Sequence, residues 1–355
     1  MSHALSASGL SPNSRVNYWP YVAMVAVYLS WSTTFAAMRV GIETLPPAVL
    51  TALRYGWTVL LFAPFVDGRV WRLPPRVWGM NALVGLLIFG LGNSLTPFNL
   101  QIIPTGVAAA VVALNPFWLL ALSWVLPPKE RVTPGVLGAL VLGLGGLLLV
   151  LSPDMPYWFK GGHSAVLTAV LWQIVASFGW SLGSMLARWL HQAEPQAAHL
   201  GFRFQLGLVV QQNLVAALAL TGVAVWQGHH PWAFMTQGFS LQVLHQPHVW
   251  AVAYLVVMGT GIGMVCYLYA LQTLPLALTG TFAYVTPVLT AVLGVCYCVS
   301  PFTGSWLWKC RRYFAGSPDS SLNSSTLQIS LLRCNAALAH HDAFGVLFAA
   351  HYAGR

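Results

Sequence analysis

The chain has 355 residues, of which 57% are apolar and only 6% are charged, and its formal net charge is +9. Soluble domains carry roughly a quarter charged residues, so this composition excludes a soluble globular fold, which would lack the polar surface to cover its core. The basic residues lie in short loops between apolar runs, which is typical of cytoplasmic loops in membrane proteins and argues against a nucleic-acid partner.

The apolar runs predict membrane-spanning helices, because each is long enough to cross a hydrocarbon layer of about 30 Å. Lipid cannot satisfy exposed backbone groups, so helix is the expected structure for such runs. After a polar, Ser-rich tail at 1–17, the expected helices are 18–39, 47–66, 78–99, 104–126, 133–152, 164–190, 200–226, 249–273 and 275–299. The fold class expected from the sequence is therefore an all-α polytopic membrane protein.

The distribution of Arg and Lys predicts the orientation of these helices. With a cytoplasmic N-terminus, the inside loops hold most of the basic residues, namely Arg15, Arg69, Arg72, Arg76, Lys129, Arg131, Arg188 and Arg203. The outside loops up to residue 299 hold only Arg39 and Lys160. Because basic loops stay in the cytoplasm, we expect the N-terminus on the cytoplasmic side.

An internal repeat divides the chain into two related halves. One constant offset relates Trp31, Ser32, Arg39, Pro46 and Arg54 to Trp180, Ser181, Arg188, Pro195 and Arg203. A second constant offset relates Leu100, Gln101, Pro104 and Pro116 to Leu271, Gln272, Pro275 and Pro287. A unit with an odd number of spans ends on the side opposite to where it began, so its copy must be inverted. Inverted repeats of this kind are a recurring plan of secondary transporters, with the substrate site between the halves.

Several stretches resemble the EamA-type transporters of the drug/metabolite transporter superfamily. They are Trp31-Ser32-Thr33-Thr34-Phe35 with Arg39, Pro46-Pro47, Ala52-Leu53-Arg54-Tyr55, Pro104-Thr105-Gly106-Val107-Ala108, Leu114-Asn115-Pro116, and Lys129-Glu130-Arg131-Val132-Thr133 before a Gly-rich span. A weaker second copy runs from Trp180 to about Val295. The resemblance implies about ten helices in two inverted five-helix repeats, both termini in the cytoplasm, and export of amino acids, metabolites or drug-like compounds. It also implies a place in the cytoplasmic (inner) membrane of a bacterium.

The expected repeats are 18–152 and 153–299, and the second of them is incomplete. The second offset maps Lys129-Glu130-Arg131 and the fifth span to about 300–323, where no tenth apolar span is evident. We therefore expect 300–355 to be a divergent or frameshifted C-terminal tail. If this tail is genuine, the second half lacks one helix.

Three motifs suggest enzymatic or cofactor chemistry but fit membrane helices better. Gly179-Trp180-Ser181-Leu182-Gly183 has the spacing of a hydrolase nucleophile elbow, which requires a strand-to-helix turn. Gly259-Thr260-Gly261-Ile262-Gly263 lacks the strand and crossover helix of a dinucleotide site. Glycines here, and those at 138, 143, 145 and 146, favour close helix packing. The Cys and His residues of the tail match no zinc spacing, so we expect no enzyme, metal or cofactor.

The expected substrate pathway consists of polar, aromatic and proline residues at mid-span. They are Trp31, Thr34, Arg54, Asn93, Asn115, Pro116, Trp180, Tyr269, Tyr284, Thr286 and Pro287. Arg54 is a functional candidate because an unpaired cation in a span is costly, although snorkelling from a helix end is an equal alternative. Inversion would place Arg54 near the outer end of its helix and Arg203 near the cytoplasmic end. The two prolines would interrupt the helical hydrogen bonds at matching depths.

This set favours a transporter of small zwitterionic or amphipathic solutes that works by alternating access between the repeats. No acidic residue before the tail lies within a span, so either Glu43 couples protons from the outer mouth or the protein is a uniporter. A carrier of nucleotide sugars or phosphorylated metabolites would require more buried Lys and Arg. An inactive relic and a membrane-embedded enzyme remain as alternatives of another class. The expected partners are the lipid bilayer and a small-molecule substrate, and a homodimer is compatible with the sequence.

Overall fold

The computed structural model of the chain describes residues 17–103, 105–127, 130, 132–151, 163–193, 201–236 and 246–299. All regular secondary structure in these ranges is helical. Seven helical segments are long and apolar enough to cross a membrane, namely Trp19–Ile42, Pro47–Phe65, Pro75–Asn99, Val107–Val125, Ser164–Ala193, Gly201–Trp226 and Pro247–Thr273. Two shorter apolar segments, Pro134–Leu149 and Leu276–Thr290, account for the other two expected spans. The expected tail at 300–355 lies outside the described residues.

The first repeat consists of short helices joined end to end. Its helices are α1 (Trp19–Trp31), α2 (Thr34–Ile42), α3 (Pro47–Phe62), η1 (Ala63–Phe65), η2 (Gly68–Arg72), α4 (Pro75–Gly85), the π-helix η3 (Leu86–Asn93), α5 (Leu95–Asn99), α6 (Thr105–Val112), α7 (Asn115–Val125) and α8 (Pro134–Leu151). The first span is therefore interrupted at Ser32 and Thr33, where a continuous helix was expected. Pro116 occupies the first turn of α7, a position where proline costs no backbone hydrogen bond.

The second repeat repeats this plan with longer helices. It comprises α9 (His163–Ala193), α11 (Gly201–Trp226), α12 (Pro231–Thr236), α13 (Pro247–Tyr254), the π-helix η7 (Leu255–Met264), α14 (Val265–Thr273), α15 (Leu276–Gly280) and α16 (Phe282–Val299). Pro287 lies inside α16, unlike Pro116, which begins a helix. The expectation that the two prolines interrupt their helices alike is therefore wrong.

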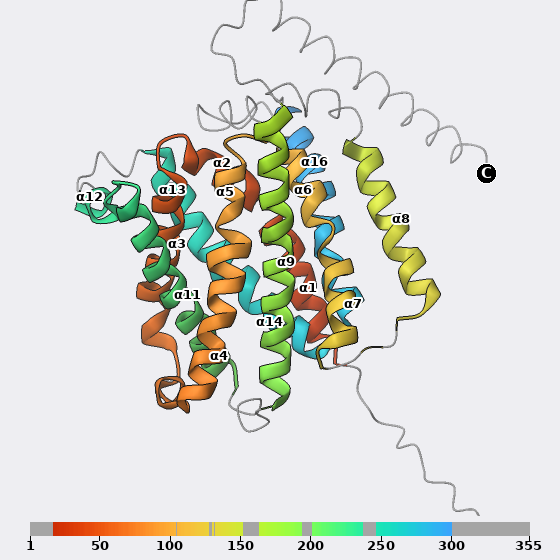
Figure 1. Cartoon of the computed structure of the whole chain (residues 1–355), viewed down its shortest axis with the longest axis horizontal. Helices are drawn as coiled ribbons and strands as arrows, with labels where there is room; N and C mark the ends of the chain where they lie inside the picture. Colours follow the sequence, from red (N-terminus) through yellow and green to blue (C-terminus); the bar gives the residue numbers. More distant parts are fainter. Residues whose placement is uncertain are drawn as a thin grey trace, which may run out of the picture. The chain divides into compact units, whose positions relative to one another are not determined.

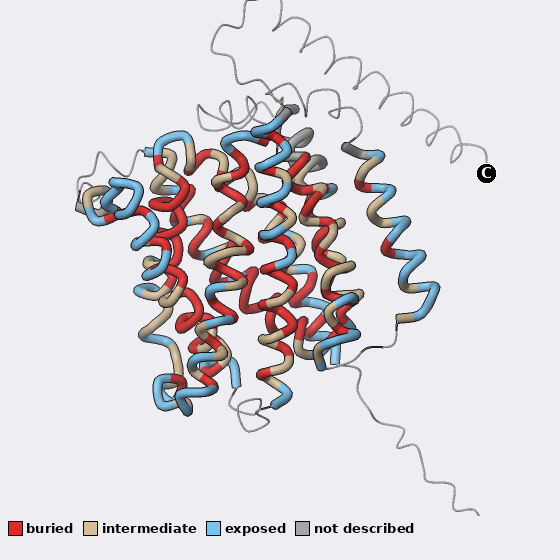
Figure 2. Tube along the Cα trace, in the orientation of Figure 1, coloured by how far each residue is buried: buried red, intermediate tan, exposed pale blue. Residues whose placement is uncertain are grey.

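The two halves run in opposite directions through the bundle. In Figure 1, α1 and α2 run from the lower to the upper edge, and α9 runs from the upper edge to the lower. Arg39, at the end of α2, donates to the carbonyl of Leu100, and its copy Arg188 donates to the carbonyl of Leu274 (3.0 Å) at the opposite end. Figure 2 shows buried residues concentrated along the inner faces of the helices and exposed residues at both ends. The inverted repeat predicted from the sequence is confirmed.

The bundle has two ends, which we name after one acidic residue each. The Glu43 end carries the connection between α2 and α3, and the Asp67 end carries the connection between α3 and α4. At the Asp67 end, the Asp67 carboxylate caps η2 by accepting from the backbone nitrogen of Arg69 (2.9 Å) and pairs with its guanidinium. The side-chain hydrogen bond from Arg69 is the main reason why the pKa of Asp67 falls to about 2.

Candidate functional site

Four aromatic rings from both repeats meet at the centre of the bundle. Trp31 of α1 lies 5.4 Å from Trp180 of α9, 5.2 Å from Tyr267 of α14 and 4.9 Å from Phe282 of α16, measured between ring centroids. Several of these contacts are edge-to-face, a geometry worth about 0.5–1.5 kcal/mol per pair beyond burial. We call these four side chains the aromatic cluster. Trp31 and Trp180 are copies of each other in the repeat, so the cluster lies where the two halves meet.

Two glycines allow the halves to approach this closely. A Cβ placed on Gly92 would come within 2.9 Å of the backbone nitrogen of Trp180, and one on Gly263 would collide with the indole of Trp31. Gly92 and Gly263 are related by the same offset as Leu100 and Leu271. Each repeat therefore uses the same glycine to receive the tryptophan of the other repeat, as expected for inverted copies.

The expected packing role of the glycine motifs is confirmed for most of them. Added Cβ atoms on Gly259, Gly261 and Gly263 would all meet neighbouring side chains within 3.0 Å. Gly179 and Gly183 pack likewise against Leu91 and Ile88, within a continuous helix that has no nucleophile elbow. In α8 the expectation holds only for Gly143, which faces Tyr284. The glycines at 138, 145 and 146 face open space.

The two π-helices η3 and η7 lie at equivalent places in the repeats and border the aromatic cluster. A π-helix shifts hydrogen bonding to i→i+5 and often marks a functional site. In η7 the carbonyl of Gly259 accepts a hydrogen bond from the indole nitrogen of Trp31 (3.0 Å). The indole of Trp180 makes no equivalent bond to a backbone carbonyl among the described residues and instead lies against Tyr267, with 5.6 Å between the ring centroids. The two halves therefore share a backbone plan but differ in polar detail.

Arg54 lies near the middle of α3 and is only 3% exposed. Its Nε donates to Thr260 Oγ1 of η7 (3.0 Å), and one terminal nitrogen lies 3.5 Å from Asn93 Oδ1 of η3. An added Cβ on Gly259 would lie 2.9 Å from the other terminal nitrogen, so this glycine makes room for the guanidinium. The expectation that Arg54 lies near a helix end, with snorkelling as one alternative, is wrong, because the side chain is buried at mid-helix.

The repeat copy of Arg54 has a different environment. Arg203 is exposed at the start of α11, at the Asp67 end, and its Nε donates to the carbonyl of Phe65 (3.0 Å). Arg188 forms an ion pair with Glu130 (2.8 Å). Within the described ranges, no carboxylate forms an ion pair with Arg54. Arg54 is therefore a buried cation held by neutral oxygen atoms.

The other expected pathway residues divide into three groups. Thr34 is buried beside Gly259 and belongs with Trp31, Arg54, Asn93 and Trp180 at the centre. Asn115 bonds to Ser177 and joins α7 to α9, while Pro116 packs against Gly280. Thr286 donates to the carbonyl of Phe282, and Pro287 is buried one position later. Tyr284 packs on Gly143, and its hydroxyl has no partner within the part of the chain that the structure describes. Tyr269 lies apart from all of these, exposed on the periphery.

Reasoning from the sequence missed three residues at this centre, namely Thr260, Tyr267 and Phe282. The glycine-rich surroundings of Thr260 favour helix packing and give no signal that this side chain binds Arg54. Tyr267 lies two positions before Tyr269, and residues two apart on a helix do not share a face. The repeat gives no signal for Tyr267 or Phe282, because the residues at the equivalent positions of the first half, Thr96 and Val111, are not aromatic.

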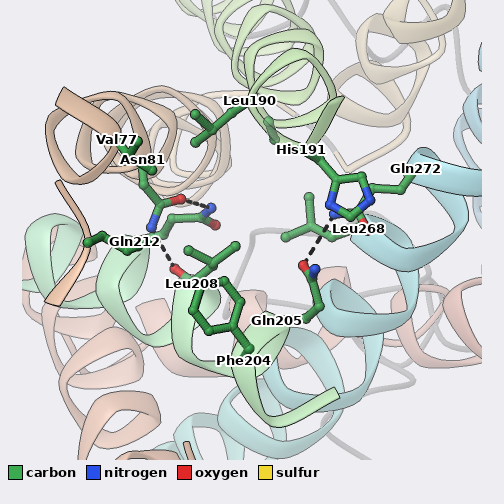
Figure 3. Close-up of a pocket in the computed structure, with 12 residues that line it drawn as sticks. Val77, Asn81, Leu190, His191, Phe204, Gln205, Leu208, Gln212, Leu268 and Gln272 are labelled. Carbon is green, nitrogen blue, oxygen red and sulfur yellow. Dashed lines mark hydrogen bonds between the residues drawn. The ribbon is translucent and has the colours of Figure 1, made fainter. Parts of the chain in front are cut away.

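Two pockets lie at opposite ends of the bundle. The pocket at the Glu43 end is formed by the α2–α3 connection with Phe98, Gln101, Gln227 and His229, and Glu43 lines it. The pocket at the Asp67 end lies between α4, α9, α11 and α14, and Figure 3 shows its amide side chains. The described part of the chain holds no cluster of three or more His, Cys, Asp or Glu residues suited to a metal ion.

Comparisons with known proteins agree with this architecture. The profile of the EamA-like transporter family matches residues 18–152 and again 167–308. The chain is 29% identical to a protein of Escherichia coli K12 named "Uncharacterized inner membrane transporter YedA", over 77% of this chain and 80% of that protein. It is 25% identical to a "Probable amino-acid metabolite efflux pump" of Salmonella typhimurium, over 57% of this chain and 64% of that protein.

One solved structure, described only as a crystal structure of a protein, has the same fold. It covers 84% of this chain and 94% of its own, with a TM-score of 0.59 and 22% identity. The apolar helices and the YedA relative support a multi-pass protein of a bacterial inner membrane, and the relatives point to a transporter of small solutes rather than an enzyme. With both of its halves matched by the family profile, the chain belongs to the EamA-like transporter family.

Proposed function

We propose that this protein exports small zwitterionic or amphipathic organic solutes by alternating access between its inverted repeats. In this proposal the carboxylate of the solute pairs with Arg54 and its apolar part packs on the aromatic cluster. The observation that carries the proposal is the buried guanidinium of Arg54, whose partners Thr260 and Asn93 are neutral. The name of the Salmonella efflux pump supports amino acids or related metabolites as the solute class.

A solute carboxylate would offset the cost of burying the Arg54 guanidinium. Burying a cation without a counter-ion costs several kcal/mol, and charged groups inside a membrane bundle typically mark a substrate or ion pathway. A solute carboxylate would offset this cost with charge-assisted hydrogen bonds, each worth about 1.5–3 kcal/mol.

A nucleotide-sugar or phosphorylated-sugar carrier is a weaker proposal. A phosphate dianion would require several free cations around the centre. Arg39 is engaged with the carbonyl of Leu100, Arg188 with Glu130, and Arg203 is exposed at the Asp67 end. Of these four arginines, only Arg54 lies beside the aromatic cluster with neutral partners. One cation at the centre favours a solute with a single negative charge.

The opposed pockets support an alternating route. By the positive-inside pattern, the Asp67 end would face the cytoplasm and the Glu43 end the outside. A solute would then reach Arg54 from the pocket at the Asp67 end and leave through the pocket at the Glu43 end. The equivalent π-helices η3 and η7, one from each repeat, border the aromatic cluster. A change in their helix register would open the route to one end of the bundle as it closes the route to the other end.

Transport and binding by the purified protein test this proposal. The probe is 3-phenylpropionate, which combines one carboxylate with one aromatic ring. Arg54→Gln should weaken its binding and counterflow by about tenfold or more, as expected for one lost charge-assisted contact, while Arg54→Lys should retain part of both. The matched control is Arg203→Gln, the same change at the exposed repeat copy, which should behave like the wild type. Equal activity of Arg54→Gln and the wild type would refute the role of Arg54.

A further inference from the structure

The pocket at the Asp67 end contains a network of amide side chains on its α4–α11 wall (Figure 3). Asn81 Nδ2 donates to Gln211 Oε1 (2.9 Å) and to the carbonyl of Leu208 (3.2 Å). Gln212 Nε2 donates to Asn81 Oδ1 (2.7 Å), and Gln211 Nε2 donates to the carbonyl of Val70 (2.7 Å). The side-chain groups of Asn81 and Gln211 are therefore all satisfied within the protein.

This network fixes the orientation of the Gln212 amide. Asn81 Oδ1 requires a donor, and the NH₂ group of Asn81 is already committed to two acceptors. Gln212 must therefore present its NH₂ group to Asn81, which leaves Oε1 without a partner among the described residues. Gln212 is only 2% exposed, and in Figure 3 its amide points toward the middle of the pocket. A buried carbonyl oxygen without a donor is energetically costly, so this oxygen is a specific acceptor for an N–H group of a ligand.

The remaining walls of the pocket are mostly apolar and uncharged. Val77, Leu190, Phe204 and Leu268 line it, and across from Gln212 the amides of Gln272 and Gln205 bond to each other (3.3 Å). The cavity itself measures about 30 Å³, enough for a small polar group, and the wider empty space of about 480 Å³ includes open solvent, where the rest of a solute would lie. Its lining residues include no Asp, Glu, Lys or Arg. The lining therefore offers an acceptor to an N–H donor on an apolar body, and its only donors for a carboxylate are amide NH₂ groups and the His191 imidazole.

We propose that this pocket is a loading subsite that binds the ammonium or amide N–H group of the solute through Gln212 Oε1. This inference rests on the proposed function, in which the carboxylate is bound separately at Arg54. The same span carries both sites, with Asn81 on α4 and Asn93 at the end of η3. Asn81 and Asn93 are twelve residues apart, which corresponds to about 18 Å along a helix. The subsite is therefore separate from the Arg54 site.

Two probes separate the subsite from the Arg54 site. Phenylethylamine has the donor without the carboxylate, and 3-phenylpropionate has the carboxylate without the donor. On purified protein, measured by titration calorimetry, Gln212→Leu should weaken phenylethylamine binding by about tenfold, as expected for one lost hydrogen bond to a buried group. It should leave 3-phenylpropionate binding unchanged. Arg54→Gln should give the reverse pattern.

Two further variants distinguish binding from a structural role. Gln212→Glu should retain phenylethylamine binding, because a neutral carboxylic acid can donate its O–H to Asn81 and still present a carbonyl to the pocket. Asn213→Leu is the matched control, since Asn213 is also buried, its Oδ1 has no partner in the described ranges, and it does not line the pocket. Its affinity for both probes should match the wild type.

The outcomes bear separately on the two proposals. If Gln212→Leu binds phenylethylamine as the wild type does, or if it loses both probes equally, the loading subsite is wrong. If 3-phenylpropionate binding is insensitive to Arg54→Gln while the phenylethylamine result holds, the proposed function fails and the subsite stands. Absence of phenylethylamine binding by the folded wild type would also overturn the subsite.

Discussion

At the scale of single residues, the guanidinium of Arg54 determines what the centre of the bundle can bind. Its partners Thr260 and Asn93 come from different repeats, so the position of the cation depends on how the halves meet. Tyr55, the next residue, lies with its ring 5.4 Å from the guanidinium carbon and is itself fully buried. A change in the relative position of the repeats would therefore alter the surroundings of the charge directly.

The same glycine-to-alanine substitution should affect stability differently at two positions in the π-helices. Gly263→Ala places a methyl group against the indole of Trp31, whereas Gly90→Ala meets only Leu86, at 3.7 Å. Overpacking costs typically about 1–3 kcal/mol, so Gly263→Ala should lower the thermal unfolding midpoint and Gly90→Ala should not. Thermal unfolding of the purified variants measures this. Equal midpoints for the two variants would show that the close contact between the halves is not needed.

Single-residue roles were only partly predictable from the sequence. Trp31, Arg54 and Trp180 were identified because the repeat marked them and because their chemistry is costly inside a bundle. The sequence does not indicate which of Tyr267 and Tyr269 faces the centre, because period alone cannot show which face of an apolar helix points inward. The lipid-facing side and the inward-facing side of a membrane helix are both apolar, so hydrophobicity does not separate core from surface as it does in a soluble protein.

At the scale of elements, the helices themselves were predictable and their internal interruptions were not. The expected ranges 47–66 and 133–152 correspond to α3 with η1 and to α8 within about two residues. The π-helices were not expected, because π geometry here accompanies contacts made by distant residues such as Trp31 and Arg54. Local sequence contains no record of those partners.

The α7–α8 connection is attached to the second repeat through one carboxylate. Glu130 pairs with Arg188 of α9 and also accepts from the backbone nitrogen of Leu276 (3.0 Å) at the start of α15. Arg188 is 8% exposed, so Glu130→Ala would leave a buried cation and should destabilise the protein by about 3–5 kcal/mol.

The double variant Glu130→Ala, Arg188→Met tests the cause of this loss. It should be more stable than Glu130→Ala alone, because the uncompensated charge is gone. Chemical denaturation in detergent, followed by tryptophan fluorescence, gives both values. A double variant that is less stable than the single one would show that Arg188 stabilises the fold independently of Glu130.

At the scale of the whole molecule, the inverted architecture follows from the repeat. Glu43 lines the pocket at its own end of the bundle, and none of the described spans carries an acidic residue near the aromatic cluster. If protons drive transport, Glu43 is the candidate group, and Glu43→Gln should abolish uptake driven by an imposed pH gradient while leaving counterflow intact.

The acidic residue at the other end provides a control for this experiment. Because the pKa of Asp67 is lowered to about 2, its interaction with Arg69 is fully present above the pKa of the unfolded chain and is lost only as the pH falls through about 2. Asp67→Asn should therefore not alter any pH dependence between about pH 5 and 8. Gradient-driven uptake that survives Glu43→Gln would indicate another coupling group, and a wild type without gradient-driven uptake would indicate a uniporter.

The central claim is that one site at Arg54 is reached alternately from both sides of the membrane. The most direct measurement uses a variant without the native cysteines that carries Asn93→Cys, labelled by a membrane-impermeant thiol reagent in right-side-out and in inverted vesicles. We expect labelling from both sides, slowed by 3-phenylpropionate, and no labelling of Leu142→Cys on the exposed face of α8. Labelling of Asn93→Cys from one side only would contradict alternating access to this site.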